Sequence, residues 1–231
     1  MVKQKRFNRV MATLLTAVMI FTSLGIGQWG IQAAYGAETL SGSGTASDPY
    51  QITSAEDLAS LGGQTLEGVY EITADIDMSN VQMSPIKSLK GDLIGNGHVV
   101  SNLAISGSGN VGLIGELKGG SVENLTLTGV TVSGGSNTAV LVGLVSSSAT
   151  ITGCMVKNST VSSTGYAGGL VGKTDGSSSD EIAITCCGVE NTEINNTGTS
   201  TSYIGSGSLV GYSYYGKLNA AMCYGKEVTV K

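Results

Sequence analysis

The sequence has 231 residues, including 35 glycines and two prolines, and a formal net charge of −5. With 41% hydrophobic residues it is too apolar for intrinsic disorder, and its abundant glycine and small polar residues favour short strands joined by tight turns. Both arginines lie among the first nine residues, so the rest of the chain has no guanidinium group to contact phosphates. These features exclude a typical nucleic-acid-binding protein.

The N-terminus has the layout of a secretory signal peptide. Four basic residues lie within the first nine, an uncharged apolar stretch follows, and small residues precede Gly36. We expect cleavage after Gly36 or Ala37, and we exclude residues 1–37 from the fold. The alternative is an uncleaved anchor over residues 10–29, and membrane contact is expected only through this segment. Cleavage would leave 194 residues with eight lysines and 17 acidic residues, a net charge of −9.

One short helix is predicted near the start of the exported part. It begins after Ser54, which has the residue type of an N-cap, and Asp57 stands at the third helical position. Leu58 and Leu61 share one face, and two glycines end the segment. We interpret residues 38–68 as a cap over an otherwise open end of the domain.

The main signal is an internal repeat, in which a small or β-branched residue is followed by Leu, then Ile or Val, then Gly. The closing glycines of the four copies are separated by 28, 29 and 39 residues. The copies are Gly112-Leu113-Ile114-Gly115, Val140-Leu141-Val142-Gly143, Gly169-Leu170-Val171-Gly172 and Ser208-Leu209-Val210-Gly211. Self-similarity at such periods is typical of repeat architectures.

A second element of each repeat carries apolar residues at fixed offsets. We align it in three columns, which are Val100, Val122, Ile151, Ile184 and Ala220; Leu103, Leu125, Cys154, Cys187 and Cys223; and Ile105, Leu127, Val156, Val189 and, as a break, Gly225. A unit this short cannot form its own core, so it must stack on its neighbours. We therefore predict a solenoid of about five coils over residues 69–231, with bulging loops at 173–181 and 195–202. An antiparallel sandwich and a propeller are the alternatives, although the unequal spacing argues against a propeller.

The Gly-Leu-Ile-Gly and Gly-Leu-Val-Gly tetrapeptides resemble the GLUG motif of bacterial surface proteins with pectin-lyase-like architecture. Residues 42–52, 70–78 and 95–103 also resemble the opening of such domains, so the resemblance covers roughly residues 42–231. The first coil departs from it, with Met83 and Ser84 where relatives have an aromatic residue before Pro-Ile-Gly, and Ile94 where they have Asp. The resemblance implies an all-β fold, a right-handed parallel β-helix with a short N-terminal capping helix.

Four cysteines in an exported chain would ordinarily indicate disulfides. Three of them, Cys154, Cys187 and Cys223, share the column of Leu103 and Leu125, so we expect buried, reduced thiols, with Cys186 on the opposite face. Parallel stacking of these residues fits the disulfide dihedral badly. We expect no zinc.

Acidic residues and the single histidine offer little catalytic chemistry. Asp75 and Asp77, with Asp92 one turn further, are weak candidates for calcium, and solvated edge acids are the preferred interpretation. His98 lies in a Gly-Asn-Gly-His turn with no nucleophile elbow nearby. Polysaccharide-cleaving β-helices, as the resemblance implies, use calcium-binding acids with a basic residue, commonly Arg, or a tight Asp cluster. We therefore expect no enzymatic activity and no cofactor.

Tyrosines crowd the last coils. A ligand surface for a host or cell-wall glycan or protein is one interpretation of Tyr203, Tyr212, Tyr214 and Tyr215, with Tyr224 close by in the sequence. Packing under the 195–202 loop, or against a further coil, is the interpretation that we favour. The sequence as a whole indicates an exported adhesive module or structural spacer. The alternatives are an accessory domain of a larger exported enzyme, since GLUG repeats also occur beside bacterial immunoglobulin A peptidase domains, and a carbohydrate-active enzyme.

Overall fold

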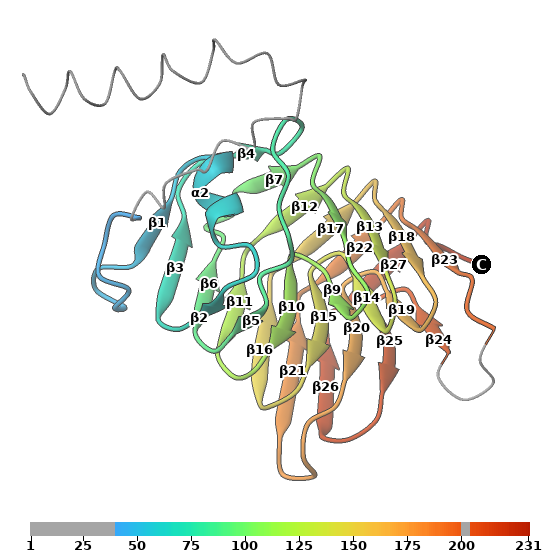
Figure 1. Cartoon of the computed structure of the whole chain (residues 1–231). Coiled ribbons are helices and arrows are strands. Elements are labelled where there is room, and N and C mark those ends of the chain that lie inside the picture. Colours follow the sequence, from blue (N-terminus) through green and yellow to red (C-terminus); the bar gives the residue numbers. More distant parts are fainter. Residues whose placement is uncertain (1–39, 200–203) are drawn as a thin grey trace, which may run out of the picture. The chain divides into compact units, whose positions relative to one another are not determined.

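The computed structural model describes residues 40–199 and 204–231, which form 28 short strands and one short helix. The strands stack in five sheets along a right-handed coil, and every strand pairing within these sheets is parallel (Figure 1). The structure confirms the predicted all-β right-handed parallel β-helix. The predicted signal peptide lies outside the described residues, and none of the helical structure that is described could span a membrane.

Each complete coil passes through five sheets in the same order, here numbered 1 to 5. Sheet 1 contains β9 (Asn110–Val111), β14 (Asn137–Ala139), β19 (Tyr166–Gly168) and β24 (Gly205–Gly207). Sheet 2 contains β2 (Thr65–Leu66), β5 (Ser88–Leu89), β10 (Ile114–Leu117), β15 (Val142–Val145), β20 (Val171–Thr174) and β25 (Val210–Ser213). Sheet 3 contains β1 (Tyr50–Ile52), β3 (Val69–Ile72), β6 (Asp92–Ile94), β11 (Ser121–Glu123), β16 (Ala149–Thr152), β21 (Glu181–Thr185) and β26 (Lys217–Ala221).

The other two sheets complete the coil. Sheet 4 contains β4 (Ile76–Asp77), β7 (Val99–Ser101), β12 (Thr126–Thr128), β17 (Met155–Lys157), β22 (Gly188–Glu190) and β27 (Tyr224–Lys226). Sheet 5 contains β8 (Ala104–Ser106), β13 (Thr131–Gly134), β18 (Thr160–Ser163), β23 (Glu193–Asn196) and β28 (Thr229–Val230). Inward side chains of successive coils stack in register, as Val122, Ile151 and Ile184 do in sheet 3, and all three are at most 1% exposed.

The single described helix, α2 (Ala55–Ser60), lies at the N-terminal end of the stack (Figure 1). The Ser54 side chain accepts a hydrogen bond from the Asp57 amide, and the Asp57 carboxylate accepts one from the Ser54 amide, which completes a capping box. Leu58 is fully buried against the first coil. The predicted capping helix is therefore confirmed, and the stacked strands around it already begin at Tyr50 in β1.

Two corners of each coil are built from a residue with positive φ followed by an inward side chain. At the corner between sheets 3 and 4 the first coil has Asn96 and Gly97, with φ of 52° and 80°, and the later coils have Asn124, Gly153, Cys186 and Met222, with φ from 51° to 63°. At the corner between sheets 4 and 5 they are Asn102, Gly129, Asn158, Asn191 and Glu227, with φ from 44° to 64°. Asparagine and glycine adopt this conformation at the lowest cost, which explains their recurrence.

The predicted columns are wrong for their first members. The alignment places Val100 and Ile105 with residues of sheets 3 and 4, but the structure places them in sheets 4 and 5. Val100 pairs with Leu127 of sheet 4, and the partner of Val122 is Leu93. Likewise Ile105 pairs with Val132 in sheet 5. The error arises because both corners use the same local pattern, an exposed Asn with positive φ followed by a buried apolar residue. Val100-Ser101-Asn102-Leu103 therefore resembles Val122-Glu123-Asn124-Leu125 in sequence, although the two segments occupy different corners.

The closing glycines of the repeat lie in strands of sheet 2, against backbone atoms of sheet 1. A Cβ on Gly143 would stand 2.6 Å from the Val111 amide nitrogen and 2.9 Å from the carbonyl oxygens of Asn137 and Gly115. Equivalent Cβ positions on Gly172 and Gly211 would also meet backbone atoms, at 2.6 Å and 2.5 Å. These contacts are with backbone atoms, so packing requires glycine at these three positions, whereas a Cβ on Gly115 would stand 3.1 Å from its nearest atom, the carbonyl oxygen of Asn110.

The loops fall where the sequence predicts them, with narrower bounds. One extends from Asp175 to Asp180 between β20 and β21, and the other begins at Thr197 and includes residues outside the described range. Asp180 links the first loop to the preceding coil. Its carboxylate accepts hydrogen bonds from the amide of Ser177 in the loop, at 2.6 Å, and from the amide of Ser148 in the preceding coil, at 3.1 Å. Hydrogen bonds from Ser177 and Ser148 lower the pKa of Asp180 to about 2.

Candidate functional site

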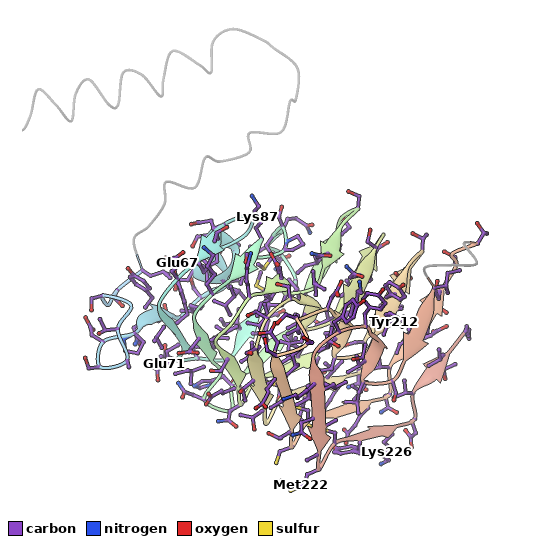
Figure 2. The ribbon with its side chains drawn as sticks, turned by 90° about the horizontal axis from the view of Figure 1, so that it is seen from below. Glu67, Glu71, Lys87, Tyr212, Met222 and Lys226 are labelled. Atoms are coloured by element: carbon purple, nitrogen blue, oxygen red, sulfur yellow. The ribbon has the colours of Figure 1, made fainter. Side chains whose placement is uncertain are left out.

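Four tyrosines from two successive coils form a cluster on the outer surface, which we call the tyrosine platform: Tyr166, Tyr212, Tyr214 and Tyr215. Tyr166 begins β19 in sheet 1, whereas Tyr212 lies in β25 of sheet 2. Register positions them, because Tyr212 pairs with Lys173 of the preceding coil and Tyr166 pairs with Gly205 of the following one. Figure 2 shows Tyr212 among the later coils of the stack.

The rings form a continuous row. The centroids of Tyr166 and Tyr212 are 4.5 Å apart, with their planes inclined by only 12°. The Tyr214 ring lies 6.1 Å from that of Tyr212 at 23°, and Tyr215 meets Tyr214 edge-on at 4.2 Å. Gly205 makes room for this stack, because a Cβ there would stand 3.2 Å from the Tyr166 ring. Offset stacking and edge-to-face contact are favoured arrangements for aromatic pairs, so the row is stabilised by its own contacts.

The ammonium group of a lysine lies near two of the rings and is paired with an aspartate. The Lys173 ammonium is 5.6 Å from the Tyr166 centroid and 5.4 Å from the Tyr214 centroid, within cation–π range of both. The Asp175 carboxylate lies 2.5 Å from the same nitrogen and balances its charge. The Lys173 side chain is only 17% exposed. The platform therefore presents partly exposed tyrosine rings to solvent, and its one ammonium group is paired with a carboxylate.

The four rings of the tyrosine platform differ in their exposure to solvent. Tyr212, Tyr214 and Tyr215 are 36%, 55% and 54% exposed, while Tyr166 is 9% exposed and forms the base of the row. Packing under the 195–202 loop or against a further coil stays a prediction, because residues 200–203 lie outside the described residues. A side-chain hydrogen bond with Tyr215 raises the pKa of Tyr214, so its hydroxyl stays protonated at neutral pH.

The structure separates the tyrosines that crowd together in the sequence. Tyr203 lies outside the described residues. Tyr224 lies on sheet 4, where its hydroxyl donates a hydrogen bond to Glu190 at 2.7 Å, and it does not join the platform. Sequence reasoning missed Tyr166 and Lys173, which come from the preceding coil. The repeat could have identified Lys173, because it and Tyr212 each follow a closing glycine.

The weak calcium candidates are engaged in local hydrogen bonds. Asp75 accepts from the Val99 amide and lies 3.0 Å from His98 Nδ1, and Asp77 accepts from Ser79 and Asn102. Asp92 lies on sheet 3, apart from the strand of sheet 4 that holds Asp77, and accepts from Ser121. Within residues 40–199 and 204–231, no group of three or more His, Cys, Asp or Glu side chains is placed to hold a metal ion.

The predicted repeat residues lie in the core or at its tight corners. Leu125, Cys154 and Cys187 are at most 1% exposed, whereas Cys223 is half-buried in the last coil. All four cysteines are free, and Cys186 is exposed. The Cys154 thiol lies 3.4 Å from the Thr152 carbonyl oxygen of its own coil and 3.6 Å from that of Val122 in the preceding one. The Cys187 thiol likewise lies 3.2 Å from the Thr185 oxygen and 3.6 Å from that of Ile151.

Comparison with known proteins gives one sequence relative and one structural likeness. No protein-family model matches the chain. The chain is 35% identical over 155 residues to Halomucin from Haloquadratum walsbyi, and the match covers 58% of the chain. It spans only 2% of the length of Halomucin. A crystal structure named a putative immunoglobulin A1 protease, from Bacteroides ovatus, superposes over 82% of this chain and 79% of its own, with 17% identity and a TM-score of 0.42.

Proposed function

We propose that the chain is an exported, non-catalytic β-solenoid module of the GLUG type that binds a glycan through the tyrosine platform. The observation that carries the proposal is the exposed, ordered row of rings near a neutralised lysine. A pyranose ring has an apolar face of C–H groups that packs on an aromatic ring, while its hydroxyls need hydrogen-bonding partners at the edge. Exposed tyrosines offer both kinds of contact at low cost in conformational entropy.

Charge supports a neutral or weakly charged ligand. The ammonium of Lys173 already pairs with Asp175, so a strongly anionic ligand would gain no free cation at the platform. The exported sequence carries eight lysines against 17 acidic residues, which disfavours anionic membranes and nucleic acid. Export itself is proposed from the N-terminal signal layout. The match to a segment that makes up 2% of Halomucin supports a role as one module within a larger protein.

A structural spacer is the second candidate. The continuous ladders of buried aliphatic residues, such as Leu127 beside Val156 and Val189, favour a stiff rod that separates other domains. An accessory domain beside a catalytic domain would use the same rigidity. These roles require no ligand at the platform.

Residues 38–231 should be screened against a glycan array and a panel of host proteins, together with a Tyr212→Ala, Tyr214→Ala, Tyr215→Ala variant. We expect saturable binding to glycans that the variant loses while its thermal unfolding remains cooperative. Binding that survives in the variant would place the site elsewhere. Absence of binding from a folded wild-type fragment would favour the spacer.

A further inference from the structure

All four cysteines of the chain and two of its methionines gather at one corner, between sheets 3 and 4, in three successive coils. They occur as adjacent pairs, which are Cys154-Met155, Cys186-Cys187 and Met222-Cys223. We call this region the sulfur corner. It lies apart from the tyrosine platform, as the positions of Met222 and Tyr212 in Figure 2 show. The proposed glycan site makes no use of it.

Strand register stacks two of these sulfur side chains on the outside of the corner. The pairing of β21 with β26 ends at Thr185 and Ala221, and the pairing of β22 with β27 begins at Gly188 and Tyr224. The two intervening residues of each coil therefore align, with Cys186 over Met222 and Cys187 over Cys223. The Cys186 amide donates to the Ala221 carbonyl at 3.0 Å, which fixes this register.

The outer pair is accessible and held in an unusual backbone conformation. Cys186 is exposed and Met222 is 77% exposed. Both have positive φ, at 54° and 55°, where the two earlier coils place Asn124 and Gly153. Because the two residues share one conformation at equivalent positions, both side chains leave the corner in the same direction. A thiol and a thioether thus replace the residues that suit this corner best.

The spacing of the pair suits a two-coordinate cation. Neighbouring parallel strands lie about 4.8 Å apart, so the side chains of these two residues start close enough together for one ion to contact both sulfur atoms. Thiolate and thioether are soft ligands, which select Cu(I) over hard cations. Hard cations would instead need a cluster of oxygen donors, which this pair does not supply.

We propose that Cys186 and Met222 form a two-coordinate site for a soft monovalent cation, Cu(I). Binding exchanges the Cys186 thiol proton for the metal, so one proton is released to solvent per Cu(I), and the Met222 sulfur donates a lone pair without changing its own protonation. No electron transfer is involved. The inner thiols of Cys154 and Cys187 stay in the core, where they donate to backbone carbonyls.

The test is an anaerobic titration of the reduced chain with Cu(I) in competition with a chromophoric Cu(I) chelator. We expect one equivalent to bind, with near-ultraviolet thiolate-to-copper absorption and one proton released. Loss of an outer-shell partner already weakens metal sites about 10- to 100-fold, so Cys186→Ser and Met222→Leu should each weaken binding at least ~10-fold. Met222→Cys restores a soft donor and should recover the affinity.

Two variants of the same corner serve as controls, and circular dichroism melting confirms that each variant is folded. Cys223→Ser alters the half-buried neighbour, and Met155→Leu removes a thioether from an adjacent coil. Both should bind Cu(I) as the wild type does. If Met222→Leu bound Cu(I) with wild-type affinity, the proposed Cys186–Met222 site would be refuted. It would also be refuted if Cys223→Ser lost as much Cu(I) affinity as Cys186→Ser. A wild-type stoichiometry other than one would also overturn it.

Discussion

Replacing Gly143 by alanine should destabilise the solenoid, because the added methyl group has no space. The new Cβ would stand 2.6 Å from the Val111 amide nitrogen and 2.9 Å from two carbonyl oxygens, and all three atoms belong to backbone held in neighbouring strands. Overpacking of this kind costs about 1–3 kcal/mol. For a domain of this size, 1 kcal/mol corresponds to about 2–4 °C in Tm, so the variant should melt roughly 2–12 °C lower.

Gly109 provides the matched control. It also lies in a loop-to-strand region of the solenoid, but a Cβ there would meet nothing within 4 Å, and its φ is not in the left-handed region. Gly109→Ala should therefore leave Tm unchanged, or raise it slightly by restricting the unfolded chain. Differential scanning calorimetry of both variants decides the matter. Equal melting temperatures for Gly143→Ala and Gly109→Ala would refute the close-packing explanation for the repeated glycine.

Three further predictions follow from the same geometry. Leu125→Asp buries an unpaired carboxylate at a site that is 1% exposed, so the variant should show no cooperative unfolding in calorimetry. Thr126→Asp, on the outer face, should still unfold cooperatively. A folded Leu125→Asp variant would contradict the inward orientation of Leu125. Asn158 has a φ of 49°, so Asn158→Ala should lower the free energy of unfolding, measured with urea, by about 1–2 kcal/mol, and Asn158→Gly should lower it less. The reverse order would contradict the positive φ proposed as the reason for asparagine and glycine at this corner. Asp180 has its pKa lowered to about 2 from 3.8, so the native state binds fewer protons and the carboxylate stabilises the fold above about pH 4. The difference in Tm between wild type and Asp180→Asn should therefore shrink as the pH falls from 4 toward 2, and a gap independent of pH would exclude this linkage.

The fold was predictable because its signals are local and repeated. The glycines of the tetrapeptides mark the approach of sheets 1 and 2, and the Ser54 capping box marks the N-terminal helix. The first coil was placed at the wrong corner because Asn102-Leu103 and Asn124-Leu125 satisfy the same turn geometry. Only strand pairing, which depends on contacts between distant residues, separates those two corners.

The candidate site was only partly predictable. Crowding in the sequence identified Tyr212, Tyr214 and Tyr215, but it also suggested Tyr224, which the register places on another sheet. Tyr166 and Lys173 belong to the preceding coil, and only the repeat, in which Lys173 and Tyr212 each follow a closing glycine, connects Lys173 with the cluster. The exposure of the rings depends on which sheet face each residue occupies, and a local pattern does not report that.

The affinity of Tyr212→Ala for a glycan captured by the wild type tests the central claim most directly, with Tyr224→Ala as the matched control. Tyr212 lies in the middle of the ring row, whereas Tyr224 has similar exposure on sheet 4. A central aromatic contact is typically worth about 2 kcal/mol or more, so calorimetric titration should show Kd rising roughly 30-fold for Tyr212→Ala. Tyr224→Ala should keep the wild-type Kd. Equal affinities for the two variants would contradict the assignment of the tyrosine platform as the binding site.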